Sequence, residues 1–506
     1  MALEAVAKMG ITSMDKYFIY FLITYLVTAL LFQLFTKNRR PRIQLQPPPS
    51  PPALPILGHI PLLYSSTRPF HKSLTTLAFR DGAPFMRIFI GPFSQFMVVS
   101  EASLAKQLVE EHEMSFVTIR LKNHAYGMSN LVLLRSILDS DSQVKRFEHA
   151  REREVLRLLE VLVDKAEQGE ACDLGAELEK VVNNVLFSMI MKIQSDSYES
   201  VKIREFVNGL GAEIGGRSFV LSELFGQFLC GRNKLEGLLL KFDEFLEEII
   251  LRHENRGSVT DRDVVDSLKD EEQAADLPRN NIKGVVLETL MAGSGTMSVA
   301  LKWTLAEIIN HPSVLNKLRE EIVGVVGLHK LIQDSDIPKL PYLQAVVKEG
   351  LRLHPPTPLI MRKCTHGCQI GGYDVIPDSR IIVNVYAIMQ DTGTWKFPTE
   401  FIPERFLETP STYNELLVDA KGQNLCYLPF GGGSSACPGA RLAINMIQMV
   451  IGTLVHCFDF EAKGGINMEE GCLGSSAGMA KPLVCHPIDK HVIKPSAKAL
   501  SSDFHF

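Results

Sequence analysis

The sequence lacks the features that mark several classes of protein. Lysine and arginine number 53 against 58 aspartates and glutamates, so the formal net charge is -5. A nucleic-acid-binding protein needs a basic surface, so nucleic acid is excluded as a partner. The nine cysteines are sparse and odd in number. They follow no framework spacing, which excludes a disulfide-stapled secreted domain and favours a reducing compartment.

Cysteines and histidines at the spacing of a metal site are scarce as well. Cys364 and Cys368 flank His366 and could form half of a zinc site, but no second half follows at the spacing of such sites. The favoured interpretation of this segment is a loop between strands. The chain is, however, long and rich in apolar residues. Its 506 residues, 46% of them hydrophobic, are enough for several domains or for one large fold.

One apolar run, from Tyr17 to Phe35, contains no charged residue. About 20 helical residues cross the hydrocarbon layer, so this run is long enough for one membrane span. Basic residues between Lys37 and Arg42 follow it and are typical of a cytoplasmic flank. A cleaved signal peptide is the alternative, but it needs basic residues before the run and a small-residue cleavage site. We therefore predict a retained membrane anchor in residues 1–36.

A proline-rich segment separates the anchor from the rest of the chain. The prolines between Pro47 and Pro55 disfavour helix and favour a stiff, extended hinge, which we place in residues 37–58. Residues 59–506 are predicted to form one globular domain that is mainly α with small β sheets. Helical periodicity is clear in Arg151–Ala166, Leu238–His253 and Ile282–Ile309, and strands are expected at Phe85–Gly91, at Gln95–Ser100 and within Cys368–Val385.

The strongest chemical signal is the segment from Phe430 to Gly439, FGGGSSACPG. Its glycines let the backbone approach a flat, bulky group, and Pro438 suits the first turn of the apolar helix that follows. Cys437 is therefore expected at a helix N-terminus, where unpaired N–H groups and the helix dipole stabilise a thiolate. Alone, a cysteine in such a loop is more often a small buried hydrophobe.

Two further motifs precede this loop, and their order along the chain is informative. Glu349 and Arg352 are three residues apart on one predicted helix, and Pro403-Glu404-Arg405-Phe406 follows about fifty residues later. Glu-x-x-Arg, then Pro-Glu-Arg-Phe, then the cysteine loop together resemble the cytochrome P450 superfamily. The proline hinge, LRLHPPTPL (Leu351 to Leu359) and NMEEG most closely resemble its plant microsomal, or A-type, members.

The resemblance implies the superfamily's α-rich catalytic domain for residues 59–506, with haem b as cofactor. It implies that Cys437 is the axial ligand of the haem iron, and that Glu349, Arg352 and Arg405 form a buried ion network beside the haem. Ala292-Gly293-Ser294-Gly295-Thr296 matches the superfamily's oxygen-binding groove, with Thr296 as the catalytic hydroxyl. The other positions implied to contact haem are Phe430, Gly433, Gly439, Arg362, Ala292 and Gly293.

The predicted substrate pocket is apolar, as a lipophilic ligand requires. Its expected walls come from the long helix, from the strand after LRLHPPTPL and from a C-terminal loop. They are Leu290, Met291, Thr357, Leu359, Ile360, Ser476 and Ala477.

Three departures from the superfamily pattern stand out. Gly295 occupies the position of the usual acid before the threonine, so protons have to come from water, from Ser298 or from elsewhere. Ser435 stands where an arginine usually pairs with a haem propionate. The segment from Tyr126 to Ser140 is about one helix shorter than expected and lacks the usual Trp-x-x-x-Arg. Arg362 is then the remaining propionate partner and Arg135 a weak substitute, which predicts weakened haem binding or an incompletely assembled copy.

The resulting hypothesis is a monooxygenase that uses O2 and electrons from NADPH–cytochrome P450 reductase. We expect it in the endoplasmic reticulum membrane, as a single-pass protein with a cytoplasmic catalytic domain. The resemblance favours a lipophilic plant specialised metabolite, a triterpenoid or flavonoid, as substrate. Two alternatives stay open: an oxygen-independent rearrangement of a peroxide, which the glycine at position 295 permits, and a haem-poor, non-catalytic relative.

Overall fold

The computed structural model describes most of the chain beyond the predicted anchor. The described residues are 46–63, 68–91, 94–118, 131–138, 145–215, 232–255, 263–275, 278–407, 425–471 and 477–490, with a few isolated residues between 20 and 31. Of the predicted membrane span, Tyr17 to Phe35, the structure describes only these isolated residues.

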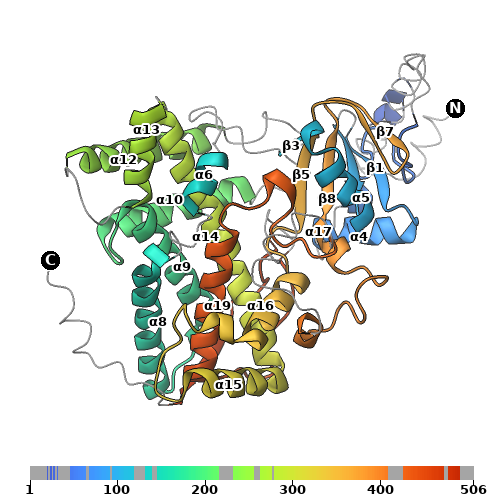
Figure 1. Ribbon diagram of the computed structural model, residues 1–506. Coiled ribbons are helices and arrows are strands. Elements are labelled where there is room, and N and C mark those ends of the chain that lie inside the picture. The colour runs from blue at the N-terminus through green and yellow to red at the C-terminus, as the bar shows by residue number, and fades with distance from the viewer. Residues whose placement is uncertain are drawn as a thin grey trace, which may run out of the picture.

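The described part is mainly helical, as expected. The longest helices are α8 (Glu148–Gln168), α9 (Leu174–Met191), α10 (Tyr198–Gly215), α12 (Arg232–Asn255), α13 (Val264–Ala275), α14 (Arg279–Asn310), α15 (Pro312–Val326), α16 (Pro341–Leu353) and α19 (Ala440–Cys457). Shorter helices are α3 (Ile60–Leu63), α4 (Phe70–Arg80), α5 (Ala102–Lys106), α6 (Leu131–Leu138) and α17 (Val385–Met389). In Figure 1, α14, α16 and α19 lie side by side in the middle, with α8 to α13 on one side and the largest sheet on the other.

The sheets are small. Five strands pair in the order β1-β2-β8-β5-β3, three in the order β4-β10-β9, and two as β6-β7. Their bounds are β1 Phe85–Ile90, β2 Ser94–Val99, β3 Phe116–Thr118, β4 Cys172–Asp173, β5 Leu359–Cys364, β6 Cys368–Ile370, β7 Tyr373–Val375, β8 Arg380–Asn384, β9 Phe458–Glu461 and β10 Val484–Asp489. The predicted strand pair is present as β1 and β2, and β5 to β8 account for the β-rich region after α16.

Helix α14 runs through the main core because apolar residues cover most of its surface rather than one stripe. It packs against α9, α16 and α19. Both α14 and α19 are long and apolar enough to cross a membrane, but 61% and 83% of their apolar windows are buried inside the protein. That degree of burial identifies them as core helices.

Candidate active site

The loop before α19 is a series of tight turns that ends at Cys437. Gly431 and Gly433 have φ angles of 75° and 68°, a left-handed conformation that favours glycine. The N–H of Cys437 donates to the carbonyl oxygen of Phe430 at 2.9 Å, and the N–H of Ala436 donates to that of Gly433 at 3.1 Å. These bonds fold residues 430–437 back on themselves and leave the cysteine at the end of the loop.

Cys437 is unlike the other cysteines of the chain. Among the seven cysteines that the structure describes, it alone is exposed. Helix α19 begins at Ala440, with Gly439 as its N-cap residue. Pro438 thus belongs to a turn before the helix, not to its first turn as expected, and the thiol lies just outside the helix N-terminus. A Cβ added to Gly439 would meet no atom within 4 Å, so there is open space beside the loop.

One face of α14 is open in the middle of an otherwise buried helix. Ala292 and Gly295 are exposed, and a Cβ added to Gly295 would meet nothing within 4 Å. Thr296 lies next to them on the helix surface and donates its hydroxyl hydrogen to the carbonyl oxygen of Ala292 at 2.6 Å. Gly293 faces another way, because its added Cβ would lie 3.1 Å from Cδ1 of Leu186 in α9.

The two serines near Thr296 point away from this open face. Ser294 is buried and its hydroxyl bonds the side-chain oxygen of Asn183. Ser298 is 2% exposed and donates to the carbonyl oxygen of Ser294 at 2.7 Å. Ser298 was one of the expected proton sources in place of the missing acid. Its hydroxyl donates within the helix and is turned away from the open face.

Glu349, Arg352 and Arg405 come together in one buried network. The carboxylate of Glu349 accepts two bonds from Arg352, at 2.7 and 2.9 Å, and one from Nε of Arg405 at 3.0 Å. Arg352 also donates to the carbonyl oxygens of Met389 and Pro398, at 2.9 and 2.8 Å. Each charge therefore has a partner, which a buried ion network requires.

The remaining residues predicted for the site differ in their burial and in the elements that carry them. Arg362 lies on β5 and is 5% exposed. Ile360, on the same strand, is half-buried, and its Cδ1 is 3.4 Å from the Cβ position of Gly431, so β5 borders the cysteine loop. Leu359 and Met291 are half-buried and Thr357 is exposed, whereas Leu290 and Ala477 are buried. Ser476 lies outside the described residues.

A contact that the sequence analysis missed joins α14 to the C-terminal loop. Nε1 of Trp303 donates to the carbonyl oxygen of Ala477 at 2.6 Å. The Trp303 ring stacks on His354, with centroids 4.2 Å apart, and Nε2 of His354 lies 2.7 Å from a carboxylate oxygen of Glu307. Trp303 follows Thr296 by seven residues, about two helical turns, and this spacing could have indicated that both lie on one side of α14.

Protein partners engage the side chains of both histidine-containing clusters. Cys364 is buried at the end of β5, and its Sγ donates to the carbonyl oxygen of His366 at 3.0 Å. Cys368 begins β6, so this segment is the expected loop between strands.

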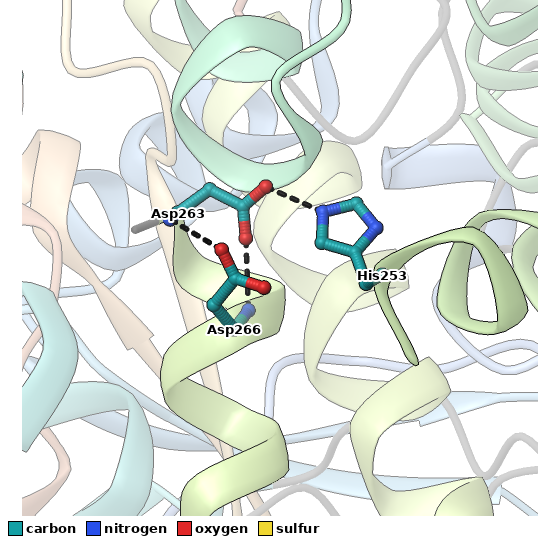
Figure 2. Close-up of side chains that lie close together, drawn as sticks. All are labelled: His253, Asp263 and Asp266. Carbon is teal, nitrogen blue, oxygen red and sulfur yellow. Dashed lines mark hydrogen bonds and ion pairs between the residues drawn. The ribbon is translucent and has the colours of Figure 1, made fainter. Parts of the chain in front are cut away.

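The second cluster contains His253, Asp263 and Asp266 (Figure 2). Both ring nitrogens of His253 are engaged, by the carbonyl oxygen of Ile249 at 2.8 Å and by Oδ2 of Asp263 at 2.6 Å. Asp263 and Asp266 bond each other's backbone N–H groups, as in a helix capping box at the start of α13. A helix cap and an ion pair therefore account for these three side chains.

The open face of α14 and the exposed thiol suit a flat cofactor bound through sulfur. The glycines at 295 and 439 leave room on both elements, because added side chains there would meet no atom. Arg362 is a buried cation on β5 and would supply a positive charge for a cofactor carboxylate. A helix N-terminus beside the thiol favours its ionised form. These residues fit haem b.

Comparison with known proteins agrees with this chemistry. A family model for cytochrome P450 matches residues 48–476. Cytochrome P450 705A1 of Arabidopsis thaliana is 35% identical over 500 residues, which cover 92% of this chain and 95% of that protein. Beta-amyrin 24-hydroxylase of Glycine max is 33% identical over 516 residues, covering 94% and 98%. 3,9-dihydroxypterocarpan 6A-monooxygenase of Glycine max is 32% identical over 511 residues, covering 93% and 98%. This chain belongs to the cytochrome P450 family and is a monooxygenase that binds haem b through a cysteine thiolate.

Proposed function

We propose that Cys437 is the thiolate ligand of the haem iron and that the open face of α14 forms the groove in which O2 binds. The observation that carries this proposal is the exposure of Cys437 at the end of a glycine-rich loop, while the other described cysteines are buried or half-buried. Phe430, Gly433 and Gly439 shape that loop. Ala292 and Gly295 leave space along the open face of α14, whereas Gly293 packs against α9. Arg362 would hold a haem propionate.

When bound, haem supplies the oxidative step, in which one atom of O2 enters a C–H bond of the substrate. The residues of the protein position the bound groups and deliver protons. Thr296 holds its hydroxyl hydrogen on the carbonyl oxygen of Ala292, so the hydroxyl oxygen is available to accept a hydrogen bond from water. Because the side chain at 295 is absent and Ser298 is turned inward, we infer that water on this face delivers protons.

The proposed substrate is a lipophilic plant specialised metabolite, with triterpenoid or flavonoid scaffolds favoured. Two relatives support this choice, one named for hydroxylation of beta-amyrin and one for oxygenation of a pterocarpan. The proposed pocket wall is formed by apolar or small residues. It consists of Leu290, Met291, Thr357, Leu359, Ile360, Ser476 and Ala477.

The proposed electron donor is NADPH–cytochrome P450 reductase, with both proteins in the endoplasmic reticulum membrane. Support comes from the uncharged run between Tyr17 and Phe35 and the basic residues after it. Residues 1–36 would be the anchor, 37–58 the hinge and 59–506 the cytoplasmic catalytic domain. Alkaline carbonate extraction tests this arrangement: the full chain should stay in the membrane pellet, and a chain without residues 1–36 should be released more readily.

The activity is tested in microsomes that contain the full chain and a plant reductase. Triterpene and flavonoid substrates are screened for oxygenated products, with NADPH, O2 or the reductase omitted in turn. The proposal expects product only when all three are present. Undiminished turnover without them would instead support the rearrangement of a peroxide, the second candidate, which Gly295 permits.

A further inference from the structure

One arginine from outside the cysteine loop binds two of its carbonyl groups. Nη2 of Arg135, in α6, donates to the carbonyl oxygen of Ala436 at 3.3 Å and to that of Gly433 at 3.4 Å. The first of these carbonyls belongs to the peptide that joins Ala436 to Cys437. The N–H of the same peptide donates to Phe430 at 2.9 Å. The peptide immediately before the thiolate is therefore held at both ends.

A second peptide of the loop is held in the same way. The carbonyl of the Gly433–Ser434 peptide accepts from Arg135 and also from the N–H of Ala436 at 3.1 Å. Its N–H, on Ser434, donates to a carboxylate oxygen of Glu113. Glu113 belongs to the short 3-10 helix η2 (Glu113–Ser115), so it reaches the loop from a different element than Arg135 does.

Gly433 is what lets Glu113 approach the backbone this closely. A Cβ on Gly433 would lie 2.5 Å from Oε1 of Glu113 and 3.0 Å from the carbonyl oxygen of Val109. This glycine has a left-handed φ of 68°, a conformation that favours glycine. Both outside contacts involve an ionised side chain, and charge-assisted hydrogen bonds are roughly twice as strong as neutral ones.

We propose that Arg135 and Glu113 are positioning residues that fix the cysteine loop before and after haem binds. The inference rests on the proposed role of Cys437 as the iron ligand. This chain has Ser435 within the loop and offers no cationic side chain between Phe430 and Gly439. The positive charge next to the thiolate peptide therefore comes from α6. Arg135 restrains the Ala436–Cys437 peptide, Glu113 restrains the Gly433–Ser434 peptide, and together they keep the sulfur in one position.

The test compares full-length Arg135→Ala, Glu113→Ala and Glu113→Gln with the wild type. Glutamine keeps an oxygen that can accept from Ser434, so it separates loss of the hydrogen bond from loss of the charge. Arg157→Ala is the matched control, because Arg157 is a half-buried arginine of α8 that pairs with Asp196 and Glu154 and not with the cysteine loop in any described bond. Two rates are measured: haem transfer to apomyoglobin, and hydrogen exchange of residues 430–439 in the haem-free chain.

We expect Arg135→Ala and Glu113→Ala to release haem about tenfold faster, the effect of losing one charged hydrogen bond. Both should also speed exchange in residues 430–439 of the haem-free chain. Glu113→Gln should lie between Glu113→Ala and the wild type, and Arg157→Ala should stay near the wild type. Wild-type rates in both alanine variants would overturn the inference. If Arg135→Ala does not fold, equal rates in Glu113→Ala and Glu113→Gln overturn it. A wild type that binds no haem through sulfur would contradict the proposed role of Cys437 instead.

Discussion

Single buried charges in this protein are stable only because their partners are present. Glu349 and Arg352 are both 0% exposed, and Arg405 completes the network. The guanidinium of Arg352 also lies over the ring of Trp395 at 5.1 Å. Removing one partner leaves a buried charge without compensation, which costs far more than the loss of an exposed pair.

The variant Glu349→Gln should therefore destabilise the protein strongly. Gln cannot balance the two arginines, so we expect a loss of about 3–5 kcal/mol in the free energy of unfolding, measured by urea denaturation. Lys165→Ala, which removes a solvent-exposed partner of Glu170, should have a much smaller effect. Equal effects of the two substitutions would show that the network is not a structural necessity.

His253 is expected to make stability depend on pH. Burial lowers its pKa, but the hydrogen bond and charge of Asp263 outweigh burial, and Asp266 adds to them, so the pKa is raised above its ordinary value. A raised pKa means that the ion pair stabilises fully below the unfolded pKa of about 6.5 and fades as pH rises through the folded pKa.

We predict that the advantage of the wild type over His253→Gln shrinks as pH rises above the unfolded pKa of about 6.5 and through the raised folded pKa. Gln still donates to Asp263 but does not titrate, so other ionisable groups cancel in the comparison. Urea denaturation at several pH values measures the difference. A constant or growing difference would contradict the assignment of a charged His253.

At the scale of elements, α14 and α16 approach each other closely at Gly350. A Cβ there would clash with Oγ1 of Thr304 and lie 3.1 Å from its Cβ. We expect Gly350→Ala to cost about 1–3 kcal/mol, because both helices are buried and the clash involves atoms close to the backbone. Gly324→Ala, in α15, meets nothing within 4 Å and should stabilise by about 0.5–1 kcal/mol. Thermal unfolding measures both, and a neutral Gly350→Ala would contradict the close packing.

Helix α14 is also tied to the C-terminal loop through Trp303. Trp303→Phe keeps a ring against His354 but leaves the carbonyl of Ala477 without its donor. We expect a loss of about 1–3 kcal/mol and faster hydrogen exchange in residues 477–480. The other tryptophan is the matched control: Nε1 of Trp395 has no hydrogen-bond partner in the described structure, so Trp395→Phe should change exchange in this loop little. Similar hydrogen exchange in Trp303→Phe and Trp395→Phe would contradict a stabilising bond between Trp303 and the C-terminal loop.

For the whole molecule, the sequence was most informative where a local pattern carries the structure. Helical periodicity predicted α8 and α14 closely, but it placed the start of α12 at Leu238, whereas the helix begins at Arg232. Motif order indicated the family and the Glu349 network. The orientation of Gly293 toward α9 follows from its position in the helical repeat relative to Ala292 and Gly295, so it could have been predicted. The bonds from Glu113 and Arg135 to the cysteine loop could not, because they join residues roughly 300 positions apart. Such contacts depend on tertiary packing, which no short-range pattern encodes.

The central claim concerns one sulfur atom, and the absorption spectrum of the reduced, carbon monoxide-bound protein tests it most directly. The wild type and Cys426→Ser, a control on a half-buried cysteine of the same region, should both show the Soret band typical of thiolate ligation. Cys437→Ser should lose that band while the protein stays folded. A thiolate-type band that persists unchanged in Cys437→Ser would contradict the account.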